Sequence, residues 1–221
     1  MITLAIDSST PRGSVALLDG DRLVAEENFG RGELFIALAK LAASGMGVSP
    51  VHVIAKTGET PVPLPKLDLI VVGVGPGSFT GIRAGIAAAK GLALPRRVPI
   101  VPACSFDAIA LTALPQMPRD CPQMCVLCDG RREEVYFAMY DRQGRRAGDC
   151  RLGALEAIAA HNPIWFVSAE MEKYRNALCE TFGGFATVCE TPVFPNAAML
   201  RPSSLPLEPI YLRETDYRRS N

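Results

Sequence analysis

The sequence has little of what a membrane protein, a signal-bearing secreted protein or a highly charged nucleic-acid-binding protein needs. Its longest apolar candidate, residues 67–74, falls far short of the ~18 residues of a membrane span and contains Asp68 and Gly73. The 23 basic and 23 acidic residues cancel, so no overall field attracts nucleic acid or an anionic membrane. The first residues are strand-like and lack the basic-then-apolar pattern of a signal peptide. We therefore expect a soluble, cytoplasmic protein.

Histidine is scarce, and cysteine is present in an odd number. The two histidines, His52 and His161, match no ligand spacing, which argues against metallohydrolase chemistry. The seven cysteines include one cluster, Cys121, Cys125 and Cys128. Residues 124–127 are typical of a strand, on which side chains three apart point to opposite faces, so the thiolates would not converge on a metal. We expect buried structural thiols in a reducing compartment.

The first hundred residues predict an α/β unit. Apolar alternation and turn signals indicate strands at 2–7 and 14–18, a third strand ending near residue 28, a helix at 32–44, a buried strand at 67–74, a helix at about 79–94 and a strand at 98–101. Residues 45–65 are rich in glycine and proline and are expected to form a long loop.

A second unit is expected after Pro102. Its predicted strands are 124–128, 134–140, 147–152, 164–168 and 186–189, and its predicted helices are 105–114, capped by Ser105, 155–161 and 170–182. The order strand, strand, strand, helix, strand, helix therefore occurs twice. That order indicates an α/β protein of two lobes, 1–102 and 103–221, which are related in architecture but not in sequence.

The Gly-rich turn after the 67–74 strand is a candidate anion site. Its sequence from Gly75 is GPGSFTGIR, and a strand–turn–helix of this kind exposes backbone N–H groups at the helix N-terminus. The turn lacks the lysine of a P-loop and fits no register of the dinucleotide fingerprint. Two interpretations stay open: an anion site with Gly75, Gly77, Ser78 and Thr80 near the ligand, and a tight turn that serves packing.

The helix after this turn carries small residues, Gly81, Gly85, Ala88 and Ala89, at spacings of three and four. Such a ridge lets another backbone approach closely, either within the lobe or from a partner. Glycine costs about 1 kcal/mol relative to alanine inside a helix, so the ridge has a packing use. The helix is apolar nearly all round except for Arg83 and Lys90, and its second face favours an interface.

Several segments together resemble the TsaB family, also called YeaZ. They are AIDSST and GSVAL within residues 5–17, GPGSFTGIRAG at 75–85 followed by GLA at 91–93, DGRREEVY at 129–136, and PIYLR at 209–213. The resemblance implies a two-lobed actin/hexokinase-like (ASKHA, ribonuclease H-like) α/β fold. It also implies a non-catalytic partner of TsaD, the enzyme that transfers the threonylcarbamoyl group to adenosine 37 of tRNA in t6A biosynthesis.

The resemblance carries further expectations about partners. It implies a heterodimer with TsaD, joined by the ATPase TsaE, a homodimer when the chain is alone, and only indirect contact with tRNA. The expected interface residues are Leu34, Phe35, Leu38, Gly81, Arg83, Gly85 and Ala88. No cofactor is assigned, and ATP or ADP at the partner interface stays open. The tail, about 205–221, is expected to pack back on the first lobe.

The sequence departs from the family pattern in three places. The first helix is short and begins near the run Gly30-Arg31-Gly32-Glu33, the 45–65 loop is longer than usual, and residues 195–204 are too short and proline-rich for the helix that the family has there.

One alternative is an autonomous ATP-dependent phosphotransferase, because Asp7, Ser9 and Thr10 resemble the first phosphate loop of sugar kinases. The sequence offers no second phosphate loop or general base, and Gly183-Gly184 is explained equally by a turn. We expect Asp7 to hydrogen-bond the turn after the first strand instead. A glycoprotease is disfavoured by the missing histidine motif.

The arginine-rich stretch 131–151 raises the question of direct tRNA contact. Its six arginines and five acidic residues, of which Asp129 lies just before the stretch, nearly cancel in charge, so we expect a solvated hairpin.

Overall fold

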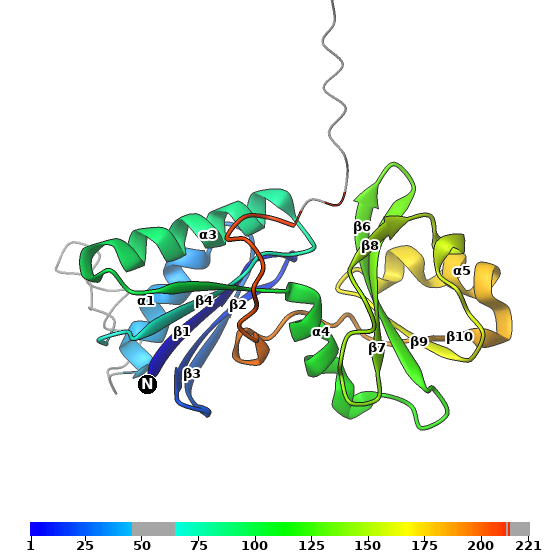
Figure 1. Cartoon of the computed structure of the whole chain (residues 1–221), viewed down its shortest axis with the longest axis horizontal. Helices are drawn as coiled ribbons and strands as arrows, with labels where there is room; N and C mark the ends of the chain where they lie inside the picture. The colour runs from blue at the N-terminus through cyan, green and yellow to red at the C-terminus, as the bar shows by residue number, and fades with distance from the viewer. Residues whose placement is uncertain (46–64, 211, 213–221) are drawn as a thin grey trace, which may run out of the picture.

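The computed structural model describes residues 1–45, 65–210 and 212, and these form two lobes, each built on a five-stranded mixed sheet (Figure 1). The first lobe contains β1 (Ile2–Asp7), β2 (Gly13–Asp19), β3 (Arg22–Phe29), α1 (Leu34–Gly45), β4 (Leu69–Gly73), α3 (Phe79–Ala93) and β5 (Ile100–Ala103). Its strand order is β3-β2-β1-β4-β5. β1 pairs antiparallel with β2 and parallel with β4, and β4 pairs parallel with β5.

The two faces of the first sheet are covered differently. Large side chains such as Leu4 and Ile6 pack on one face under the buried sides of α1 and α3. The other face carries small residues such as Ala5 and is covered by α4 (Ser105–Ala113) and by the segment around Ala197. Alternating large and small residues along β1 therefore determine which face can hold the thicker helical layer.

The second lobe contains β6 (Gln123–Arg131), β7 (Glu134–Asp141), β8 (Arg151–Gly153), β9 (Ile164–Val167), α5 (Met171–Phe182) and β10 (Ala186–Val188). Its strand order is β10-β9-β6-β7-β8. Tyr140, Phe166 and Leu127 are among its fully buried side chains.

Most of the expected elements are confirmed within one to three residues, but two expectations in the second lobe are wrong. The predicted helix at 155–161 is a single 3-10 turn, Leu155–Ala157. A seven-residue segment gains few helical hydrogen bonds, and Pro163 blocks its extension. The strand expected at 147–152 is observed only at Arg151–Gly153, beyond Gly148, whose φ is +84°. The expected 45–65 loop falls almost entirely outside the described residues.

The chain returns from the second lobe to the first after α5 and β10. The Ser14 hydroxyl donates to the Pro195 carbonyl and accepts from the Ala197 N–H, both at 2.8 Å. Further along, the Ile210 N–H donates to the Val74 carbonyl at 2.9 Å. In Figure 1 this orange-to-red segment runs back over the first lobe. None of the helices in the described ranges combines the length and apolar character that a bilayer-spanning segment requires.

Ser14→Ala tests how strongly this return holds the lobes together. The substitution removes the partner of two buried backbone groups, so we expect the free energy of unfolding in urea to fall by about 1–3 kcal/mol. Ser203→Ala is the matched control, because the Pro102 carbonyl keeps its bond from the Ser203 N–H. An equal loss of unfolding free energy in the two variants would show that the Ser14 hydroxyl does not hold the returning segment.

Candidate functional site

Asp7 lies at the end of β1, fully buried, and joins three segments of the chain. Its Oδ1 accepts hydrogen bonds from the Ser9 N–H at 2.9 Å and the Ser9 hydroxyl at 2.7 Å. Its Oδ2 accepts from the Ser105 hydroxyl at 2.7 Å, and that hydroxyl in turn accepts from the Gly75 N–H at 3.1 Å. The expected bond from Asp7 to the turn after β1 is present, and Ser105 adds a link to the start of α4.

Burial raises the pKa of Asp7, although the hydrogen bonds from Ser105 and Ser9 oppose that rise. Each carboxylate oxygen already has a donor from the chain itself. A side chain so enclosed holds segments together and is out of reach of a dissolved substrate. Ser105, expected as a helix cap, uses its hydroxyl for this network. Cys104 occupies the N-cap position, and its side chain makes no capping hydrogen bond to the helix.

The Gly-rich turn packs tightly against the residues after β1. The Ser78 N–H donates to the Ser9 carbonyl at 2.6 Å, and a Cβ on Gly77 would overlap that same carbonyl. The N–H groups of Gly75 and Gly81 are also engaged, by Ser105 and Ser78 respectively. The geometry at these positions therefore supports the packing interpretation of the turn. Thr10 and Thr80 lie outside this network: the Thr10 hydroxyl donates to the Arg12 carbonyl, and Thr80 is exposed.

The small-residue ridge of α3 faces inward, which corrects the expectation that it meets a partner. A Cβ on Gly81 would overlap the Ser8 carbonyl, and one on Gly85 would lie 2.5 Å from the Ser8 hydroxyl oxygen. Ala88 is buried as well. The ridge lets α3 approach the end of β1. Leu34 and Leu38, also expected at the interface, are buried on the inner side of α1.

A different face of the same two helices is exposed and apolar. Phe35 and Leu94 are 70% and 79% exposed, and Ile36 and Phe79 are also exposed. The guanidinium of Arg83 lies over the Phe79 ring at 5.0 Å. Because β3 and β4 run in the same direction, α1 and α3 both begin at the edge where β1 ends. We call Phe35, Ile36, Phe79, Arg83 and Leu94 the outer helix surface.

Sequence reasoning identified two residues of the outer helix surface, Phe35 and Arg83, and missed the other three. The helical spacing of the apolar residues in α3 could have identified its exposed side chains. Ile82, Ile86 and Ala89 form the buried stripe of α3, and Phe79 and Leu94 fall outside it.

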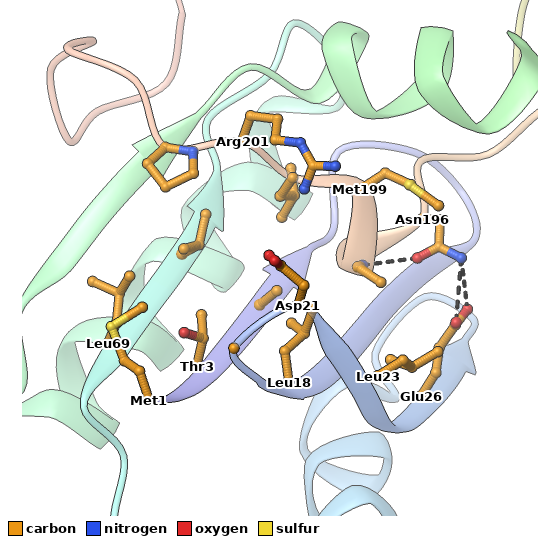
Figure 2. Close-up of a pocket in the computed structure, with 16 residues that line it drawn as sticks. Met1, Thr3, Leu18, Asp21, Leu23, Glu26, Leu69, Asn196, Met199 and Arg201 are labelled. Carbon is orange, nitrogen blue, oxygen red and sulfur yellow. Dashed lines mark hydrogen bonds between the residues drawn. The ribbon is translucent and has the colours of Figure 1, made fainter.

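A pocket of about 420 Å³ lies on the opposite face of the first sheet (Figure 2). Thr3 and Leu69 lie on one side of it, and Met199 and Arg201 of the returning segment lie on another. The Asn196 amide, at its rim, donates to both carboxylate oxygens of Glu26. None of the residues expected to bind phosphate or a partner lines this pocket.

The arginine-rich hairpin makes internal contacts. Arg142 donates to the carbonyls of Pro118 and Cys121, and Arg145 pairs with Asp141 at 2.8 Å. Nearby, Asp129 pairs with Lys173 at 2.9 Å. These contacts favour the expected solvated hairpin over a basic surface for tRNA.

The cysteine cluster is buried in the second lobe. Cys121, Cys125 and Cys128 all belong to its core, and burial raises the pKa of Cys125 and Cys128. Thiols held protonated in an apolar core are poor ligands and nucleophiles. Among the described residues, no three His, Cys, Asp or Glu side chains are grouped to hold a metal ion.

Gly81→Ala and Gly91→Ala form a matched pair on α3 that tests the inward ridge. The methyl group that Gly81→Ala introduces would overlap the Ser8 carbonyl, so we expect a loss of roughly 1–3 kcal/mol in the free energy of unfolding. A methyl on Gly91 meets open space, and the better helix former should add about 0.5–1 kcal/mol. Thermal or urea unfolding measures both values. Shifts of the same sign would show that the ridge does not pack against β1.

Comparison with known proteins gives the family. The model of the family described as TsaD, tRNA N6-adenosine threonylcarbamoyltransferase, matches residues 53–177. An uncharacterised protein of Mycobacterium tuberculosis (strain H37Rv) is 31% identical over 96% of this chain and 92% of its own length. The tRNA threonylcarbamoyladenosine biosynthesis protein TsaB of Haemophilus influenzae is 32% identical over 65% of this chain and 56% of its own length.

A solved structure agrees in fold. YeaZ from Pseudomonas aeruginosa superposes with a TM-score of 0.71 at 23% identity, covering 96% of this chain and 99% of that one. With the two five-stranded sheets, this likeness confirms the expected two-lobed α/β fold, which the chain shares with YeaZ. The family model matches more than half of the chain, and named relatives and fold agree with it, so the chain belongs to the TsaD family and, within it, to the TsaB (YeaZ) group.

Proposed function

We propose that the chain is a TsaB-like scaffold that activates a TsaD enzyme in threonylcarbamoyl transfer to adenosine 37 of tRNA. Its family membership and the names of its relatives support this assignment. The observation that carries it is the outer helix surface, whose apolar side chains are exposed on α1, on α3 and, at Leu94, just past the end of α3. Large exposed apolar side chains on neighbouring elements of one lobe favour a protein interaction site.

The same lobe argues for a non-catalytic role. An autonomous phosphotransferase needs a carboxylate that can reach its substrate and N–H groups that are free to hold phosphate. Here Asp7 is enclosed by Ser9 and Ser105, and the N–H groups of Gly75 and Ser78 are engaged by the chain itself. We therefore place the chemistry on TsaD.

The partner surface is proposed on the exposed residues alone. Phe35 and Arg83 stay in it. Ile36, Phe79 and Leu94 replace Gly81, which packs against Ser8, and the buried residues Leu34, Leu38, Gly85 and Ala88. The two helices of this surface begin at the same edge of the sheet, which suits a helix-to-helix contact with a related lobe of TsaD. Without TsaD, the same surface pairs two copies of the chain. TsaE joins the TsaD complex, tRNA is contacted through TsaD, and any ATP or ADP lies at the interface between the subunits.

Phe35→Asp tests the partner surface. We expect it to weaken binding to the cognate TsaD by about tenfold or more, because a charge replaces an apolar side chain at the centre of the contact. Phe185→Asp is the matched control, since Phe185 is 48% exposed but lies in the second lobe. Isothermal titration with purified TsaD measures both affinities, and circular dichroism checks that both variants are folded. An unchanged affinity for folded Phe35→Asp would move the interface to another face.

Asp7→Asn separates a structural from a catalytic carboxylate. Because the pKa of Asp7 is raised in the folded protein, its contribution to stability is present below the unfolded value near 3.8 and is lost as pH rises through the folded value. Asparagine does not titrate, so the melting temperature of the variant should rise relative to wild type between pH 4 and 7. The exposed Asp21→Asn serves as the control. A wild-type ATPase or kinase activity without TsaD that Asp7→Asn abolishes would favour the phosphotransferase instead.

A further inference from the structure

Two cysteines that are distant in sequence lie together where the chain passes from the first lobe to the second. Cys104 follows β5 and directly precedes α4, and Cys150 lies between β7 and β8. Their sulfur atoms are 3.9 Å apart. Cys104 is buried, whereas Cys150 is partly exposed. A dissolved oxidant can therefore reach one thiol of the pair, with the second thiol already beside it.

A charged network surrounds this pair. The Arg146 guanidinium lies 3.6 Å from the Cys150 sulfur and 3.3 Å from Asp107 Oδ1. The same Asp107 oxygen accepts a hydrogen bond from the Tyr140 hydroxyl at 2.8 Å, which holds the carboxylate beside the guanidinium. Arg146 is thus held against the more exposed of the two thiols.

The two thiols differ in how readily they lose a proton. The hydrogen bond with Cys150 and then burial raise the pKa of Cys104. The hydrogen bond from Cys104 and the charge of Arg146 lower the pKa of Cys150, against the opposing effects of burial and of Asp107. A buried thiol that stays protonated, beside a partly exposed thiol whose pKa is lowered, is the arrangement of a resolving and an attacking cysteine.

We propose that Cys104 and Cys150 are a peroxide-reactive pair that closes to a reversible disulfide. The Cys150 thiolate attacks one oxygen of hydrogen peroxide, the O–O bond breaks, and the leaving hydroxide takes a proton from solvent. The product is a Cys150 sulfenic acid. The Cys104 sulfur then attacks the Cys150 sulfur, the S–O bond breaks, and water leaves with the Cys104 proton. Overall, two thiols and one peroxide give one disulfide and two waters.

The position of the bond gives it a structural consequence. Cys104 adjoins Ser105, which holds Asp7, and Cys150 belongs to the second lobe. The disulfide would link Cys104, at the start of the connection between the lobes, to the 146–150 segment of the second lobe. Closing it requires the sulfurs to approach from 3.9 Å by about 2 Å, to the length of an S–S bond. Other cysteines suit this chemistry less well: Cys121, Cys125, Cys128 and Cys189 are buried.

The test treats the reduced, full-length chain with a few equivalents of hydrogen peroxide, blocks remaining thiols and maps peptides by mass spectrometry. We expect a Cys104–Cys150 cross-linked peptide, 2 Da lighter than its two thiol peptides together, that dithiothreitol reverses. Cys104→Ser should leave a Cys150 sulfenic acid that dimedone traps. Cys179→Ser, which removes an exposed cysteine outside the pair, should cross-link at the wild-type rate.

Arg146→Gln tests the role of the guanidinium. Without the positive charge of Arg146, the pKa of the Cys150 thiol rises and less thiolate is present. The greater nucleophilicity of the remaining thiolate offsets part of this loss, so cross-linking should slow about threefold. Arg146→Lys should restore most of the rate. Circular dichroism checks folding. In folded protein, cross-links between other cysteines, or no link at Cys150, would overturn the proposal, and an unchanged rate in Arg146→Gln would remove Arg146 from it.

Discussion

The carboxylate of Asp7 holds together the turn after β1 and, through Ser105, the start of α4 and the turn after β4. Its position imposes glycine on its neighbours. A Cβ on Gly73 would overlap Asp7 Oδ2, and the turn that follows must pass close under the Ser9 carbonyl. The close approach of α3 to Ser8 continues the same constraint along Gly81 and Gly85. The Asp7 carboxylate therefore has a structural role: its hydrogen bonds hold together the segments of the first lobe and the start of α4, which leads to the second lobe.

The packing around Asp7 determines which side chains of the first lobe stay exposed. The small residues of α3 are used to approach β1, so the helix turns Phe79 and Leu94 outward, and α1 turns out Phe35 and Ile36. A lobe with an enclosed carboxylate and exposed apolar helices is suited to binding another protein rather than to chemistry. The proposed scaffold role thus follows from the packing of a site that resembles the phosphate loop of a kinase but is filled by its own chain.

Much of the fold could be predicted from the sequence, because long apolar strands and amphipathic helices carry strong periodicity. The segment 155–161 could not, since a short apolar run with a nearby proline fits a helix and an irregular turn about equally. The direction of the Gly81–Gly85–Ala88 ridge could not either, because periodicity shows that a helix face is small but not what packs against it. The bond from Ser105 to Asp7 joins residues that are 98 positions apart, and the Cys104–Cys150 contact joins residues that are 46 positions apart. No local sequence pattern encodes contacts of this range.

The central claim is that this chain is required by a TsaD enzyme without supplying the chemistry. The most direct measurement is threonylcarbamoylation of tRNA by the purified cognate components, with TsaD, TsaE and this chain each omitted in turn. The account predicts that omitting this chain abolishes modification, that Asp7→Asn restores it when added back, and that the chain without TsaD modifies nothing. Full modification in the absence of this chain, or modification by this chain in the absence of TsaD, would contradict it.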